Sequence, residues 1–240
     1  MDLSIVIPAY NESPKIAVDV QRAAEFLESN GLQGEIIVVD DCSSDNTSRV
    51  AESVKVPTCV TLKVIRYEPH RGKGYAVRTG IKASTGRYVM FADSGYCVPF
   101  ANALPALEML KDGTCDIANA SRRLATSTIL RAQPLRRRIC SRAIRGLLKI
   151  VLGLPPGITD TQCGFKVYKG DVARELYGQC VSEGFMFDVE IILRAHKKGY
   201  RIKEFPIEWS CDLDSRLSIM RAPLPTLAEL RAIKRALSKE

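Results

Sequence analysis

The stretch Tyr88-Val-Met-Phe-Ala-Asp93-Ser94-Gly95 is the segment from which the fold of this chain is most readily predicted. Residues 89–92 form a continuous apolar run, which is typical of a strand covered on both faces. The run ends at Asp93, and a small residue and a glycine follow it. Because open α/β sheets bind their ligands at the carboxyl ends of their strands, this carboxylate marks the expected functional site.

Strands and helices alternate around this stretch. Apolar strands are predicted at residues 3–8, 35–40, 61–66 and 87–92, and helices with apolar periodicity at 15–29, 47–53 and 76–83. This order predicts an α/β, Rossmann-like fold with a mostly parallel central sheet and helices on both faces. The second half is less regular, with helices expected at 105–110, 187–197 and 226–239, strands at 116–121 and 200–208, and a short strand after a polar turn at 159–166.

Composition narrows the class of protein. The chain has 240 residues and a net charge of +8, which suits nucleic acid, anionic lipid or phosphorylated substrates. It has no apolar run of about 18 residues and no basic leader, so we expect neither a transmembrane helix nor a signal peptide. The eight cysteines contain no C-x-x-C pair, which favours reduced thiols in the cytoplasm over disulfides or a zinc site.

Residues 134–152 form a predicted basic amphipathic helix. It carries six cations and no acidic residue, and its apolar residues share one stripe. The cations could simply form a solvated face, but this pattern favours an interfacial helix on an anionic membrane. Nucleic-acid binding is disfavoured because no aromatic residue is interleaved for base stacking.

Several polar motifs follow predicted strands. Asp40-Asp41 could bind a ribose or base, or could cap the next helix. Arg71-Gly-Lys-Gly74 could approach a phosphate, although its spacing is neither a Walker loop nor a dinucleotide fingerprint. Asp93 could hold Mg²⁺ or Mn²⁺, but Gly95 replaces the second carboxylate of a D-x-D pair, so a simple turn remains an alternative.

Five motifs occur in a telling order: Ser4-Ile-Val-Ile-Pro-Ala-Tyr-Asn-Glu12, Val38-Val-Asp-Asp41, Arg71-Gly-Lys-Gly74, Asp93 and Asp160-Thr-Gln-Cys-Gly-Phe-Lys166. Together they resemble the family 2 glycosyltransferases of GT-A fold, and among these the dolichyl-phosphate glucose and mannose synthases and bacterial polyprenyl-phosphate hexose transferases. The resemblance covers roughly residues 3–210. It implies a catalytic domain at 1–210, including the basic helix, followed by a C-terminal amphipathic helical tail at 211–240.

The resemblance also implies roles for individual residues. The nucleotide is expected at Pro8, Ala9, Tyr10, Glu12, Asp41 and Lys73. Catalytic carboxylates are expected at Asp93, Asp160 and Asp188, and sugar contacts at Gln162 and Glu190. The acceptor phosphate is expected at Arg122, Arg123, Arg137 and Arg138. A Mg²⁺ or Mn²⁺ cofactor would be bound by Asp93, because Gly95 supplies no second carboxylate.

The implied reaction is inverting transfer of a hexose from a UDP-glucose or GDP-mannose type donor to polyprenyl or dolichyl phosphate. We expect it at the cytoplasmic face of a membrane, with peripheral attachment, in the synthesis of cell-envelope glycans. One alternative is a soluble family 2 transferase with a hydroxyl acceptor, which would need Asp188 or Asp160 as base. Another is a weakly catalytic nucleotide-sugar-binding protein, suggested by Gly95.

Overall fold

A computed structural model describes residues 1–134, 146, 148, 152–212 and 223–238. Its centre is a seven-stranded sheet in the order β3-β2-β1-β4-β7-β5-β8. Every neighbouring pair is parallel except those that involve β7, which is antiparallel to β4 and β5. The predicted mostly parallel α/β fold is confirmed. The strands are β1 (Leu3–Ala9), β2 (Gly34–Asp40), β3 (Val60–Arg66), β4 (Tyr88–Ala92), β5 (Ile117–Ser121), β7 (Phe165–Lys169) and β8 (Ile202–Pro206).

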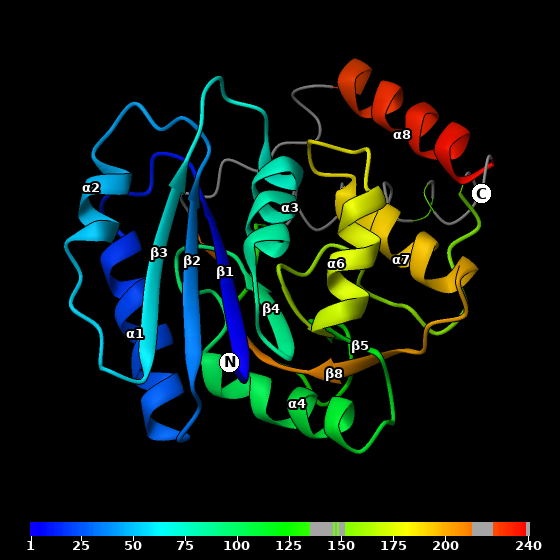
Figure 1. Cartoon of the computed structure of the whole chain (residues 1–240). Coiled ribbons are helices and arrows are strands. Elements are labelled where there is room, and N and C mark those ends of the chain that lie inside the picture. The colour runs from blue at the N-terminus through cyan, green and yellow to red at the C-terminus, as the bar shows by residue number, and fades with distance from the viewer. Residues whose placement is uncertain (135–145, 147, 149–151, 213–222, 239–240) are drawn as a thin grey trace.

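Helices cover both faces of this sheet (Figure 1). Successive residues of a strand point to opposite faces, so Ile5 and Ile7 of β1 pack into one core and Val6 into the other. The first core lies under α1 (Ile16–Ser29), α2 (Thr47–Glu52), η1 (Phe100–Asn102) and α4 (Ala103–Lys111). The second lies under α3 (Lys73–Ala83), α6 (Gly170–Gln179) and α7 (Phe187–Lys197).

Three elements depart from the sequence prediction. Helix α6 was not expected, because its first residue and its penultimate residue are glycines, which weaken the helical signal. The strand expected at 200–208 is two strands, because the chain leaves β5 after Pro206 and pairs with a different partner. The second piece, β9 (Glu208–Ser210), forms a two-stranded sheet with β6 (Thr128–Arg131), which was also not expected.

The C-terminal helix α8 (Pro223–Leu237) confirms the helix expected at 226–239, with an earlier start. It packs on α7 through Leu230 and Ile233, which meet Val189 and Leu193 in a third apolar cluster. The basic helix expected at 134–152 lies largely outside the described residues, although residues 146, 148 and 152 are helical. Within the described parts of the chain, no helix has the length and apolarity needed to cross a membrane. The cysteines described there are free thiols, as expected.

Candidate active site

A large cleft of about 330 Å³ opens where β1, β2 and β4 end. Its size is within the range of about 300–1,000 Å³ that is usual for small-molecule sites. The start of α3 and the adjacent residues Gly184 and Phe185 form part of its wall. All residues predicted to bind the nucleotide lie in its wall, namely Pro8, Ala9, Tyr10, Glu12, Asp41 and Lys73, and Asp93 lies there with them.

A smaller pocket of about 70 Å³ adjoins the large cleft. Asp93, Cys97 and Asp212 line both spaces, so these three residues mark their junction. The predicted residues Arg122 and Gln162 line the small pocket. The two spaces together could therefore receive two reactants that meet beside Asp93.

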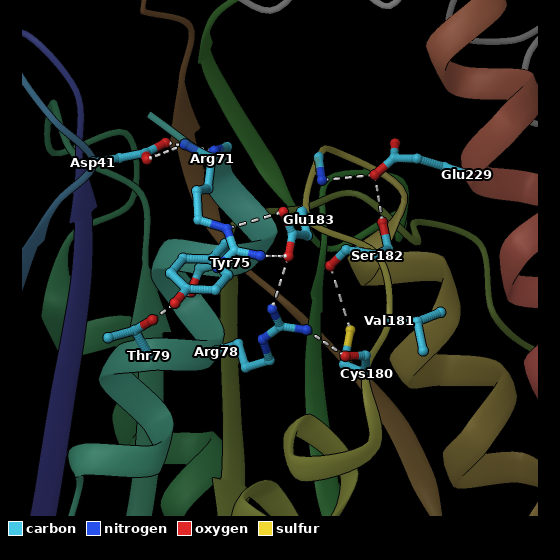
Figure 2. Close-up of polar contacts among 12 residues, drawn as sticks. Asp41, Arg71, Tyr75, Arg78, Thr79, Cys180, Val181, Ser182, Glu183 and Glu229 are labelled. Carbon is cyan, nitrogen blue, oxygen red and sulfur yellow. Dashed lines mark hydrogen bonds and ion pairs between the residues drawn. The ribbon is translucent and has the colours of Figure 1, made fainter. Parts of the chain in front are cut away.

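The Asp41 carboxylate binds the backbone of the loop that precedes α3. Its Oδ1 accepts the N–H of Arg71 and its Oδ2 the N–H of Gly72, each at 2.7 Å. The His70 Nδ1 lies 3.0 Å from Oδ2, and the His70 ring packs against Tyr10 in a tilted arrangement with centroids 4.3 Å apart. Asp41 is thus a wall residue of the cleft that also fixes the loop carrying Lys73 (Figure 2).

The neighbouring Asp40 has a different set of partners. Its carboxylate accepts the Ser43 N–H at 2.8 Å, pairs with Arg66 at 2.9 Å and accepts the Ser48 hydroxyl. It is fully buried and turned toward the start of α2. The N-cap residue of α2 is Asn46, so Asp40 does not cap this helix but holds the loop before it, whereas Asp41 faces the cleft.

Asp93 forms an ion pair with Lys73, whose Nζ lies 2.6 Å from Oδ1. Burial acts to lower the pKa of Lys73, but the Asp93 and Asp188 carboxylates outweigh it, so the pKa is raised. The Lys73 ammonium also lies 5.5 Å from the centre of the Phe91 ring. Lys73 therefore stays a cation at the point where the cleft meets the small pocket.

The first helical turn of α3 is not open to a phosphate in the way its glycines suggested. The N–H groups of Gly74 and Tyr75 donate to the carbonyls of Gly184 and Glu183, each at 3.1 Å. Anions are bound at a helix N-terminus by such N–H groups when they have no other partner. Lys73 and Ala76 of this helix line the cleft, and of these two Lys73 supplies the charged side chain.

Gly95 stands where a second D-x-D carboxylate would be, and another acid occupies that neighbourhood. A Cβ atom at Gly95 would lie 3.1 Å from Oδ2 of Asp212. Asp212 in turn pairs with Lys15 at 2.9 Å. Sequence reasoning missed Asp212, because it follows an unpredicted strand and carries no motif of its own.

Asp19 on α1 fixes the backbone at Gly95. The Gly95 N–H donates to Oδ2 of Asp19 at 2.9 Å. Burial raises the pKa of Asp19 to about 6, against the effect of the Gly95 and Tyr96 N–H groups. Gly95 also adopts φ +89°, a conformation that other residues rarely adopt.

Arg122 and Asp160 form a two-pronged ion pair beside the small pocket. The Nε and Nη2 atoms of Arg122 lie 2.7 and 2.8 Å from the two Asp160 oxygens. Although burial opposes it, the Arg122 charge holds the pKa of Asp160 below its usual value. The guanidinium lies 5.3 Å from the Trp209 ring centre, and the adjacent Arg123 is exposed. The other two arginines predicted for the acceptor phosphate, Arg137 and Arg138, lie outside the described residues.

Two predicted site acids of α7 do not line either space. Asp188 is buried in an ion pair with Lys166, and burial raises its pKa despite that cation. Its charge helps to raise the pKa of Lys73, which does line the large cleft. Glu190 is fully buried, and its carboxylate accepts the N–H groups of Val181 at 2.9 Å and Ser182 at 2.8 Å. The predicted sugar contact of Glu190 is therefore wrong: this carboxylate supports a turn.

Comparison with known proteins places this site in a family. The Glycosyl transferase family 2 model matches residues 4–177, which include the cleft residues from Pro8 to Cys97 and end within α6. The chain is 31% identical over 225 residues to a dolichyl-phosphate beta-glucosyltransferase of Saccharomyces cerevisiae and 32% over 221 residues to that of Homo sapiens. These alignments cover 86% and 87% of this chain but 66% and 67% of the relatives, so the chain spans about two thirds of their length.

Solved structures agree on the fold. A glucosyl-3-phosphoglycerate synthase from Mycobacterium tuberculosis, crystallised with Mn²⁺ and UDP-glucose, has a TM-score of 0.69 at 16% identity. The match covers 97% of this chain and 78% of that one. A mannosyl-3-phosphoglycerate synthase from Rubrobacter xylanophilus matches with a TM-score of 0.68 at 16% identity, over 100% of this chain and 76% of that one. With the GT-A architecture and the family match over most of its length, this chain belongs to glycosyl transferase family 2.

Proposed function

We propose that this protein transfers a hexose, with inversion, from a nucleotide diphosphate sugar to a polyprenyl or dolichyl phosphate. The observation that carries the proposal is the junction at Asp93, where a nucleotide-sized cleft meets a second pocket that contains Arg122. The relatives named dolichyl-phosphate beta-glucosyltransferases supply the acceptor class and favour glucose as the sugar. A β-linked product from an α-linked donor requires inversion.

In this reaction the large cleft binds the nucleotide. Tyr10, which is 37% exposed and packs against His70, lines this cleft and offers an aromatic ring for the base. Lys73 places a permanent cation beside Asp93, where the diphosphate of the donor would end. The negative charge that develops on the leaving diphosphate is thereby stabilised by a cation already in position.

The acceptor needs little chemical activation. A phosphate monoester is already anionic at neutral pH, so the main tasks are to hold it in line and to offset its charge. Arg122 lies at the small pocket with its guanidinium fixed by Asp160 and Trp209. A hydroxyl acceptor would instead need a carboxylate base. Both acids considered for that role, Asp160 and Asp188, are buried in ion pairs, which favours the phosphate acceptor.

A divalent cation such as Mn²⁺ or Mg²⁺ fits the two carboxylates at this junction. Asp93 and Asp212 both line the two spaces, and carboxylate oxygens are the ligands these ions prefer. Bound there, the ion would neutralise the donor diphosphate. The described residues contain no group of three or more His, Cys, Asp or Glu side chains arranged for a metal, so the donor oxygens would complete the coordination.

We further propose that the protein works as a peripheral protein on the cytoplasmic face of a membrane, where its lipid acceptor is presented. The support is the cationic composition of residues 134–152, which suits an anionic lipid surface. Replacing Arg137 and Arg138 with alanine should then abolish transfer to a lipid phosphate while nucleotide affinity stays unchanged.

The reaction is tested with purified protein, labelled UDP-glucose or GDP-mannose, and either polyprenyl phosphate or polyprenol, with Mn²⁺ or EDTA. We expect label to enter lipid only with polyprenyl phosphate, and EDTA to suppress it. Label on polyprenol would instead establish a hydroxyl acceptor. Nucleotide binding without transfer to either lipid would establish a binding protein and overturn the proposal.

A further inference from the structure

The side chain of Glu229 on helix α8 contacts the wall of the large cleft. Its Oε1 accepts the Ser182 hydroxyl at 2.7 Å and the Gly184 N–H at 2.6 Å. Gly184 itself lines the cleft. Figure 2 shows Glu229 reaching from α8 to residues 182–184, which we call the bridging loop.

The bridging loop lies directly against the start of α3. Its carbonyls at Glu183 and Gly184 accept the N–H groups of Tyr75 and Gly74. The two backbones approach so closely that a Cβ at Gly72 would lie 2.7 Å from the Glu183 oxygen, and one at Gly74 2.8 Å from the Gly184 oxygen. The side chain of Glu183 also pairs with Arg71 and Arg78. A shift of the bridging loop must therefore move the segment that carries Gly72 and Lys73.

The opposite end of the bridging loop is fixed by the core. Glu190 accepts the N–H groups of Val181 and Ser182, so this end is tied to α7. The end at Gly184 has its side-chain hydrogen bond from α8. Both glutamates therefore hold Ser182, but of the two it is Glu229 that also holds Gly184, at the end that lines the cleft.

We infer that Glu229 is a positioning residue for donor binding, and that the docking of α8 sets the wall of the large cleft. This rests on the proposed function, because it assigns the large cleft to the nucleotide. Binding free energies couple reciprocally, so a bound nucleotide also favours docked α8. Glu229 touches no reactant in this arrangement and acts through Gly184 and the start of α3.

The contacts allow a sharp choice of variants. Glu229→Ala removes both hydrogen bonds, whereas Glu229→Gln keeps an oxygen that can accept them. Arg231→Ala is the matched control, because Arg231 is exposed on the same helix. Gly184→Ala disrupts the same contact at its other partner, because its Cβ would lie 2.7 Å from Oε1 of Glu229.

The test measures UDP and GDP affinity by calorimetry, and amide hydrogen exchange at residues 72–76 and 181–185. Glu229→Ala should weaken affinity roughly tenfold, within the range of about 5- to 150-fold usual for coupled sites, and should speed exchange in both segments. Glu229→Gln should recover most of the affinity, and Arg231→Ala should match the wild type. Gly184→Ala should weaken binding alone, but add little to Glu229→Ala, which vacates the space that the new methyl group needs.

Unchanged affinity in Glu229→Ala, or effects of the two substitutions that simply add, would overturn the inference. So would a loss of thermal stability with unchanged affinity and exchange, which would indicate a purely structural contact. These outcomes differ from failure of the proposed function, in which the wild type itself binds neither nucleotide.

Discussion

Asp41→Asn should weaken nucleotide binding by loosening the loop that carries Lys73. Both carboxylate oxygens of Asp41 accept backbone N–H groups, from Arg71 and Gly72, at 2.7 Å. An asparagine has only one oxygen, so in either orientation its NH₂ group must face one of those N–H groups. The Asp41 side chain is nearly fully buried, so water cannot readily replace the lost partner.

The size of the effect follows from these contacts. A hydrogen bond to a charged group contributes about 1.5–3 kcal/mol, and a buried donor left without a partner costs a similar amount. If Asp41→Asn destabilises the loop conformation in which Lys73 lines the cleft, nucleotide binding must supply the lost free energy. This corresponds to an affinity roughly 10- to 150-fold weaker.

Calorimetry with UDP, GDP and pyrophosphate would check this prediction. Loss of affinity for all three ligands is expected, because the loop carries Lys73 as well as His70. The control is Asp40→Asn, whose carboxylate binds Ser43 and Arg66 outside the cleft, and which should lower stability without changing affinity. Pyrophosphate binding equal to that of the wild type would refute the reasoning, because Asp41 would then act only on the base or ribose.

Three further perturbations test other parts of the site. Asp212→Asn should weaken Mn²⁺ binding to the nucleotide complex about tenfold or more, as measured by electron paramagnetic resonance, and unchanged affinity would remove Asp212 from the ligand set. Lys166→Met should lower the free energy of unfolding in urea by about 3–5 kcal/mol, since it leaves the Asp188 carboxylate buried without its partner; a loss under about 1 kcal/mol would contradict this. Asp19, with its pKa raised to about 6, binds its proton more tightly when folded, so the wild type should lose about 3 kcal/mol of stability as pH rises from about 3 to about 7. Asp19→Asn should lack that loss. Curves of unfolding free energy against pH that run parallel for the two proteins would contradict the raised pKa of Asp19.

The sheet could be predicted closely because its strands are buried on both faces. The strands predicted at 35–40 and 87–92 contain the continuous apolar runs 36–39 and 89–92, and β2 and β4 fall within a residue or two of the predicted limits. Their carboxyl ends then fix where Asp41 and Asp93 must lie. The cleft was therefore predictable, because parallel strands bring their ends to one edge of the sheet.

The parts that were missed depend on contacts between distant segments. Asp212 approaches Gly95 because β9 pairs with β6 and Ser210 donates to the Cys97 carbonyl, and neither strand has a clear sequence pattern. Glu190 was misassigned because an acid near a helix start has the same sequence signal whether it binds a ligand or a backbone turn. The pairing of Arg122 with Asp160 likewise required the fold, since each residue alone is compatible with substrate contact.

The most direct measurement of the proposed chemistry is the NMR spectrum of the glycolipid formed from UDP-glucose and polyprenyl phosphate. We expect a phosphorus-coupled anomeric proton with the large coupling of a β-glucoside, which would establish both the phosphodiester bond and inversion. An α-configured product would contradict direct displacement at the anomeric carbon. A product without phosphorus coupling would contradict a phosphate acceptor and, with it, the role assigned to the pocket beside Asp93.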